Sequence, residues 1–377
     1  MTNAKIVTAV CITFVFIGAT FYSTKTDQTA LKNVFQKHFL IGAALNSSVV
    51  NGKDPGAAGL VEKHFNSITA ENAMKWECIH PEPNKYIFEM ADRFVDFGLK
   101  NKMFIIGHTL VWQNQIPDWA FVDNANKLLS RDAMLARMRA HISAVVGRYK
   151  GKVKGWDVVN EALTDEGALG KTKWLVTIGP DYIAKAFEYA HEADPDAELY
   201  YNDYSLDKPA KRNAVCRIVK DLQSKGLRID GVGIQGHWGM DYPTREDLDA
   251  FIDSIGALGI KVMVTELDID ILPKSFEYMG ADVTVRANLQ KGLNPYVDGL
   301  PDEVQKKLTD RYSELFAQLL AHKDKVSRVT FWGVTDKTSW LNNWPVKGRT
   351  SYPLLFDRKY QPKPAFFAVV KTAQARK

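Results

Sequence analysis

Short runs of apolar and β-branched residues alternate along most of the chain with stretches in which apolar residues recur every three or four positions. The first pattern is typical of buried strands, and the second of amphipathic helices. Strand-like runs occupy eight ranges, which are Phe39–Asn46, Ser67–Asn72, Met103–Trp112, Val153–Glu161, Glu198–Tyr204, Gly231–His237, Lys261–Asp268 and Arg328–Asp336. This alternation predicts a parallel sheet whose strands are joined by crossover helices.

The intervening stretches have the helical period, and several of them open with Asp, Thr or an early Pro, as helices often do. They include Arg131–Tyr149, Pro180–Ala193, Lys208–Lys225, Arg245–Leu258 and Pro301–His322. We therefore predict an α/β fold, a single (β/α)8 TIM barrel with extended loops after strands seven and eight. Those loops would cover Ile269–Leu300 and Lys337–Gln361. An open doubly wound sheet is the alternative, but no G-x-G-x-x-G turn follows the first strand to indicate a dinucleotide site.

The N-terminus has a different pattern from the rest of the chain. After Lys5, residues 6–22 are almost entirely apolar, a run somewhat longer than a signal-peptide core and short for a membrane span. We predict that residues 1–22 are a signal peptide, with an uncleaved membrane anchor as the alternative, and that residues 23–377 form one domain. The protein is then expected to be secreted or periplasmic, or anchored through residues 6–22.

Composition narrows the class of protein further. The chain has 377 residues, which suits one barrel with enlarged loops, and its net charge of +5 is spread out and gives no case for nucleic-acid binding. Cys78 and Cys216, the cysteines beyond the N-terminal run, are expected on opposite sides of the barrel, so we predict no disulfide. The 9 Trp and 14 Tyr include several beside carboxylates and amides, a mixture that suits sugar binding.

Polar and aromatic side chains stand at or just after the end of nearly every predicted strand. They are Glu71, Asn72, Lys75, His108, Trp112, Asn160, Glu161, Asn202, Asp203, Tyr204, Gln235, His237, Glu266, Asp268, Trp332 and Asp336. In (β/α)8 enzymes the catalytic groups lie at this face of the barrel. Each residue alone could be structural, but gathering so many ionisable groups would cost several kcal/mol per unpaired charge. The sequence therefore favours a functional site.

Two of these residues, Glu161 and Glu266, close strands four and seven and should face each other across the barrel mouth. Such a pair suits glycoside hydrolysis, in which one carboxylate attacks the anomeric carbon while the other carboxyl protonates the leaving oxygen. We predict a hydrogen-bonded chain Glu266–His237–Asp268 that keeps Glu266 ionised. Glu161 follows Asn160 in an apolar and aromatic run, which should raise its pKa toward the acid role.

The chain also resembles a known family, glycoside hydrolase family ten, the xylanases, from Phe39 to Phe367. The matching stretches are FNSITAENAMKW (65–76), GHTLVW (107–112), WDVVNEA (156–162), YYNDY (200–204), GIQGHW (233–238), VTELD (264–268) and TFWGVTD (330–336). The resemblance implies a retaining endo-β-1,4-xylanase that acts by double displacement on xylan or xylo-oligosaccharides. It implies no cofactor, no metal and no protein partner, and we expect a monomer.

The resemblance also implies roles for individual residues. Glu161 would be the acid/base and Glu266 the nucleophile. The sugars of the glycone side would bind Glu71, Asn72 and Lys75, and Tyr204 would face the leaving-group side. The site next to the scissile bond would be formed by His108, Asn160, Gln235, His237, Trp332 and Trp340, with Trp112 also binding substrate.

One departure from the family pattern is Gln113, where the family usually has His after GHTLVW. We expect it to shift a hydrogen bond on the acid/base side. Trp340, with Glu71 and Lys75, is the candidate wall that fills the space of the hydroxymethyl group of glucose. Two rival classes are a metal-dependent barrel lyase and a non-catalytic sugar-binding barrel. The first is disfavoured because the rim lacks a compact cage of three acids, and the second because both glutamates are present.

Overall fold

The computed structural model describes residues 29–273 and 291–376, and its centre is a closed ring of parallel strands. Closure follows from the pairing, because β1 pairs with both β2 and β9 while β6 pairs with β8. The ring consists of β1 (Leu40–Leu45), β2 (Ser67–Ala70), β3 (Phe104–Val111), β4 (Gly155–Asn160), β5 (Glu198–Asp203), β6 (Gly231–Ile234), β8 (Lys261–Asp270) and β9 (Val326–Phe331). The predicted (β/α)8 barrel is thus confirmed.

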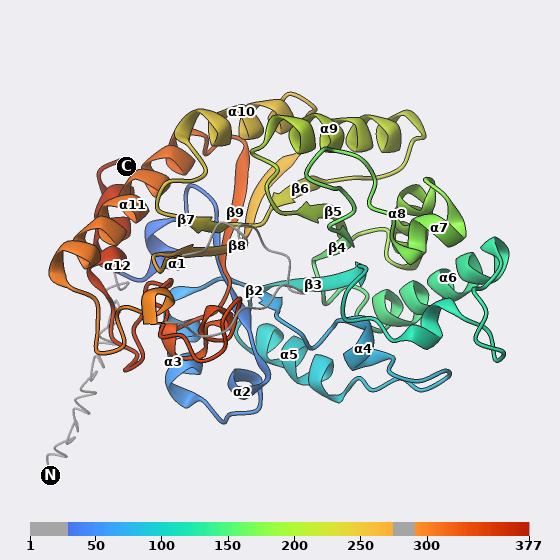
Figure 1. Ribbon diagram of the computed structural model, residues 1–377, viewed down its shortest axis with the longest axis horizontal. Helices are drawn as coiled ribbons and strands as arrows, with labels where there is room; N and C mark the ends of the chain where they lie inside the picture. Colours follow the sequence, from blue (N-terminus) through green and yellow to red (C-terminus); the bar gives the residue numbers. More distant parts are fainter. Residues whose placement is uncertain (1–28, 274–290, 377) are drawn as a thin grey trace, which may run out of the picture.

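Helices surround the ring on its outside (Figure 1), and each step from one ring strand to the next passes through at least one of them. Parallel neighbours require such crossovers. The helices are α1 (Leu31–Val34), α2 (Ser47–Val50), α3 (Pro55–His64), α4 (Trp76–Ile79), α5 (Glu89–Lys100), α6 (Arg131–Arg148), α7 (Lys173–Ile178), α8 (Tyr182–Ala193), α9 (Pro209–Ser224), α10 (Arg245–Gly256), α11 (Asp302–Ala321) and α12 (Pro364–Gln374).

The helix starts follow local sequence signals. The side chains of Ser130 and Thr244 accept hydrogen bonds from backbone N–H groups in the first turns of α6 and α10. Such caps satisfy amides that have no partner within the helix. Helix α9 begins with Pro209, whose missing N–H costs nothing at that position. The helix predicted from Pro180 begins two residues later, at Tyr182.

Some predicted strand ends were wrong. Strand six divides into β6 and the short β7 (His237–Gly239), because the pairing with β8 slips by one residue between Ile234↔Val264 and His237↔Asp268. Pairing with β7 also carries β8 two residues beyond the predicted end, to Asp270. Strand eight begins and ends earlier than predicted, so Trp332 and Asp336 follow β9.

The two predicted loops differ in how far the structure describes them. The first begins after Asp270, and residues 274–290 lie outside the described residues. The second is not structureless, because it contains two short 3-10 turns, Asp336–Thr338 and Trp340–Asn342. Cys78 and Cys216 are both free.

The predicted N-terminal signal or anchor, residues 1–22, also lies outside the described residues. Within 29–273 and 291–376, no helix has the length and hydropathy needed to cross a membrane.

Candidate active site

A cavity of about 190 Å³ opens where the strands of the ring end at their carboxyl sides. It is lined by Glu71, Asn72, Lys75, His108, Trp112, Gln115, Asn160, Glu161, Gln235, His237, Glu266, Trp332 and Trp340. All of these except Gln115 were predicted site residues. Of the other predicted residues, Asp268 lies behind His237, whereas Tyr204 packs its ring over the Lys211 ammonium at 3.7 Å.

Glu161 follows the last residue of β4 and adopts a left-handed backbone with a φ of 56°. Its Oε1 accepts a hydrogen bond from Gln235 Nε2 at 2.9 Å, and its Oε2 accepts one from Trp112 Nε1 at 2.7 Å. Burial raises the pKa of Glu161 to about 7, aided by the negative charges of Asp203 and Glu266, although both hydrogen bonds oppose the rise. This carboxyl group can therefore carry a proton near neutral pH.

Glu266 lies on β8 and has the opposite electrostatic setting. Its Oε1 accepts a hydrogen bond from Asn202 Nδ2 at 2.8 Å, and its Oε2 lies 3.1 Å from His237 Nε2. Burial alone would raise the pKa of Glu266, but the hydrogen bond from His237, the charge of His108 and the bond from Asn202 hold it below its usual value. Glu266 is therefore ionised at neutral pH.

The predicted chain behind Glu266 is present. His237 Nδ1 lies 3.0 Å from Asp268 Oδ2, and the same oxygen accepts a hydrogen bond from Trp340 Nε1 at 2.7 Å. Burial would lower the pKa of His237, but the charge of Asp268 and hydrogen bonds to Asp268 and Glu266 raise it to about 10. An imidazolium thus lies between two carboxylates and fixes the direction of Glu266.

Side-chain amides connect the two glutamates. Asn160 Oδ1 accepts hydrogen bonds from Asn202 Nδ2 at 2.8 Å and from Gln235 Nε2 at 3.3 Å. Since Asn202 also holds Glu266 and Gln235 also holds Glu161, one network sets the relative position of both carboxyl groups. Sequence reasoning noted Asn202 at the end of a strand but assigned it no role, although an amide inside the buried strand β5 was a usable signal.

Lys75 occupies the side of the cavity formed after β2. Its Nζ donates hydrogen bonds to Asn72 Oδ1 at 2.8 Å and to Gln115 Oε1 at 2.6 Å, and lies 4.9 Å from the centre of the Trp112 ring. Burial lowers the pKa of Lys75, whereas the charges of Glu266, Glu71 and Glu161 oppose this. Sequence reasoning missed Gln115, because it lies in a turn after β3 where no periodic pattern marks it.

The indole rings of Trp332 and Trp340 form another side of the cavity. The Trp332 ring meets the rings of His108 and His237 edge-on, with centroids 5.3 and 6.2 Å apart. Trp340 stacks on Trp344 at 4.6 Å. Flat apolar faces beside charged and amide groups are suited to sugar rings, which combine C–H faces with hydroxyls.

His108 and Gln113 each contact a carboxyl group. His108 Nδ1 lies 2.9 Å from Asp157 Oδ2, which orients the ring. Gln113 Nε2 lies 3.4 Å from Glu161 Oε2, so this departure from the family pattern lies beside Glu161. Among residues 29–273 and 291–376, no group of three or more His, Cys, Asp or Glu side chains is arranged to hold a metal ion.

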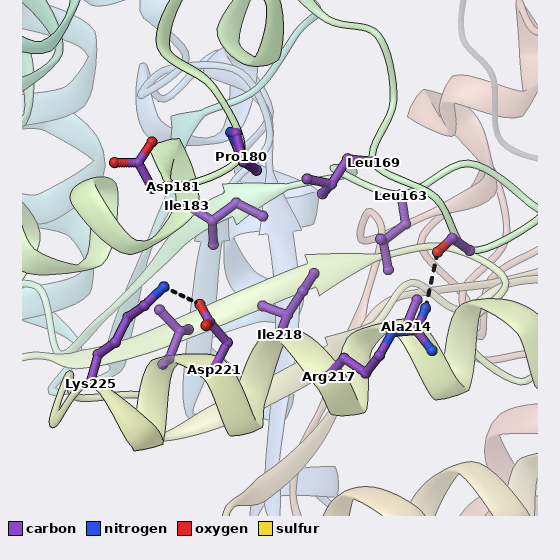
Figure 2. Close-up of a pocket in the computed structure, with 12 residues that line it drawn as sticks. Leu163, Leu169, Pro180, Asp181, Ile183, Ala214, Arg217, Ile218, Asp221 and Lys225 are labelled. Carbon is purple, nitrogen blue, oxygen red and sulfur yellow. Dashed lines mark hydrogen bonds and ion pairs between the residues drawn. The ribbon is translucent and has the colours of Figure 1, made fainter.

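A larger cavity, of about 370 Å³, lies elsewhere, between α9, the start of α8 and the segment after β4 (Figure 2). Its acidic groups are engaged, since Asp221 pairs with Lys225 and Asp181 with Arg131. None of the described residues that line it is aromatic. It lacks both the facing carboxyls and the ring surfaces of the site at the barrel mouth.

One carboxyl group that can carry a proton near neutral pH and one that is ionised, held in one network at the mouth of a (β/α)8 barrel, form the pair that glycoside hydrolysis requires. Comparison of the sequence agrees, because residues 30–372 match the model of glycosyl hydrolase family 10. The chain belongs to this family.

Individual relatives are similar over nearly the whole chain. The endo-1,4-beta-xylanase A of Xylanibacter ruminicola is 47% identical over 345 residues, which cover 92% of this chain and 94% of that protein. A beta-1,4-xylanase of Dictyoglomus thermophilum is 44% identical over 344 residues, with coverages of 91% and 90%. The structure of a GH10 endoxylanase retrieved from a sugarcane soil metagenome superposes with a TM-score of 0.88 at 42% identity, covering 91% of this chain and 99% of that one.

Proposed function

We propose that this protein is a retaining endo-β-1,4-xylanase, which hydrolyses internal β-1,4-xylosidic bonds of xylan or xylo-oligosaccharides. The observation that carries the proposal is the opposite electrostatic setting of its two glutamates, with the pKa of Glu161 raised to about 7 and that of Glu266 lowered. Double displacement needs this difference. The names of the relatives supply the substrate.

In the first step, Glu266 Oε2 or Oε1 attacks the anomeric carbon and forms a glycosyl ester, while Glu161 gives its proton to the departing glycosidic oxygen. In the second step, Glu161 takes a proton from water, whose oxygen attacks the same carbon and releases Glu266. Two inversions at one carbon leave the β configuration unchanged. The imidazolium of His237 keeps Glu266 ionised before the attack.

The remaining cavity residues bind and select the sugars. Glu71, Asn72 and Lys75 would bind the glycone side through charged and amide groups. Trp340 would fill the space of the hydroxymethyl group that glucose has and xylose lacks. Because a missing carbon is worth only about 1–3 kcal/mol in a pocket, some action on aryl cellobiosides is expected.

Residues 1–22 would direct export or anchor the chain, which agrees with a polymeric substrate outside the cytoplasm. The domain would act as a monomer, since all the proposed catalytic groups come from one chain.

The test measures reducing ends released from xylan by the wild type and by Glu266→Ala, with NMR following the anomer that forms first. We expect activity that yields the β-anomer and is lost in the variant, because alanine has no carboxylate to attack the anomeric carbon. Release of the α-anomer first would contradict retention. A wild type that binds xylan without cleaving it would refute the proposed activity.

A further inference from the structure

A buried charged cluster lies behind Glu161 and outside the residues that line the cavity. At its centre are Asp203, the last residue of β5, and Lys211 on α9, whose side chains are both 0% exposed and 2.7 Å apart. Tyr201, also fully buried, donates its hydroxyl hydrogen to Asp203 Oδ2 at 2.6 Å. Asp203 helps to raise the pKa of Glu161 through its charge, but the chemistry proposed above assigns no step to any of the three side chains.

The carboxylate of Asp203 has a hydrogen-bond donor at each available position. Its Oδ1 accepts from Lys211 Nζ and from the backbone N–H of Tyr204 at 2.9 Å. Its Oδ2 accepts from the Tyr201 hydroxyl and from the backbone N–H of Leu163 at 3.4 Å. A buried ion pair of this kind is often no more stabilising than apolar residues of similar volume, so its presence calls for a purpose other than stability.

The cluster contacts the backbone of residues 161–163. Glu161 has a left-handed φ of 56°, which residues other than glycine rarely adopt. The surrounding structure must therefore hold the backbone of Glu161 in this conformation. Strand β5 accepts hydrogen bonds from three successive backbone N–H groups. The N–H of Glu161 donates to the Asn202 carbonyl at 2.9 Å, and the N–H of Ala162 donates to the Tyr201 hydroxyl at 3.2 Å. The N–H of Leu163 donates to the carboxylate of Asp203.

The cluster also reaches the other side of Glu161. The carbonyl oxygen of Asp203 accepts a hydrogen bond from the backbone N–H of Gln235 at 2.9 Å. The side chain of Gln235 in turn donates to Glu161 Oε1 at 2.9 Å. Asp203 therefore anchors both the main chain that follows Glu161 and the amide that contacts its carboxyl group.

We propose that Tyr201, Asp203 and Lys211 are positioning residues, which hold the backbone of residues 161–163 so that the Glu161 carboxyl is aimed at the leaving oxygen. The inference rests on the proposed acid/base role of Glu161. Lys211 then acts at a distance from the substrate. Burial raises the pKa of Asp203, and the charge of Lys211 opposes this rise, which favours the carboxylate that accepts from Tyr201 and Leu163.

The test uses Tyr201→Phe in the full-length protein, with two aryl β-xylobiosides as substrates. Phenol is a poor leaving group and needs the proton of Glu161, whereas 2,4-dinitrophenolate departs without one. We expect kcat/KM for the phenyl substrate to fall about tenfold or more, as a misaligned general acid should cause. For the dinitrophenyl substrate kcat/KM, which reports the first step, should stay within about twofold. Its kcat and KM should fall together, because a misaligned Glu161 also activates water less well in the second step.

The matched control is Tyr200→Phe, on the same strand. It removes a hydroxyl group that donates a hydrogen bond to Glu198 at 2.7 Å and not to the segment after Glu161. It should lower kcat/KM for both substrates equally or not at all. Lys211→Met, if it folds, should reproduce the pattern of Tyr201→Phe.

Equal losses on both substrates in Tyr201→Phe would overturn the positioning role, because a merely destabilised enzyme loses both activities together. So would unchanged activity on the phenyl substrate. If the wild type cleaves neither xylobioside, the proposed function fails instead, and the two failures are therefore distinguishable.

Discussion

The charge of Asp268 should control the acid limb of the pH–rate profile through His237. Asp268 Oδ2 contacts His237 Nδ1 at 3.0 Å and also accepts from Trp340 Nε1, and an Asn oxygen in the same place can accept both bonds. Asp268→Asn therefore removes the negative charge and leaves the contacts. Because burial lowers the pKa of His237 and Asp268 is the main cause that raises it to about 10, the imidazole should become neutral in the variant.

The magnitude follows from what Glu266 then loses. A hydrogen bond to a charged group is worth about 1.5–3 kcal/mol, and one pKa unit corresponds to about 1.4 kcal/mol. When His237 is neutral, its Nε2 carries no proton and cannot donate a hydrogen bond to Glu266. The pKa of Glu266 should therefore rise by about 1–2 units. The nucleophile must be ionised, so kcat/KM falls as the pH drops through this pKa, and the acid limb should move to higher pH by the same amount.

The assay is kcat/KM for 2,4-dinitrophenyl β-xylobioside between pH 3 and pH 8. This leaving group needs no proton, so the acid limb reports Glu266 without interference from Glu161. The control is Asp270→Asn, two residues along β8, where the carboxylate lies 3.7 Å from Arg349 and not beside His237. An unmoved acid limb in Asp268→Asn, or an equal shift in Asp270→Asn, would refute the reasoning.

Three further changes test other parts of the account. Glu161→Ala should lower kcat/KM for xylan by about 10²–10⁴-fold. Azide should accelerate turnover of the dinitrophenyl substrate by this variant, because azide replaces the water that the lost base would activate. A variant that azide does not rescue would argue against the acid/base role. Gln113→Leu removes a long hydrogen bond to Glu161, so the pKa of Glu161 and the basic limb should rise by up to about half a unit, and a fall would be inconsistent with this contact. Burial holds the pKa of His80 at about 4, below the 6.5 of an exposed imidazole, so folding stability should decline as the pH falls from 6.5 toward 4. His80→Phe should reduce that decline in thermal unfolding, and an identical decline would contradict it.

The barrel was predictable because its signals are local. Buried strands such as β1 and β6 are continuous apolar runs, and the capped starts of α6 and α10 are marked by Ser130 and Thr244. The ends of strands were less predictable. The division of strand six depends on a one-residue slip against β8, and a slip between two segments thirty residues apart leaves no mark in either of them.

The site was predictable where residues lie at strand ends and less so elsewhere. Glu161, Glu266 and His237 stand where barrel geometry brings side chains together. Gln115 was missed because it reaches Lys75 from a turn, and its 2.6 Å contact follows from tertiary structure alone. Tyr204 was predicted to face the leaving group, and the structure adds that its ring packs on Lys211, whose burial no pattern in α9 reveals.

The central claim is that Glu266 attacks the sugar, and trapping the covalent intermediate tests it most directly. A 2,4-dinitrophenyl 2-deoxy-2-fluoro-β-xylobioside should form the glycosyl ester faster than the ester hydrolyses. Fluorine destabilises the cationic transition states of both steps, and the good leaving group offsets this slowing only in the first step. Mass spectrometry of the intact protein should show one added fluoroxylobiosyl group, and peptide mapping should place it on Glu266. An adduct on another residue, or inactivation with no adduct, would contradict the assignment.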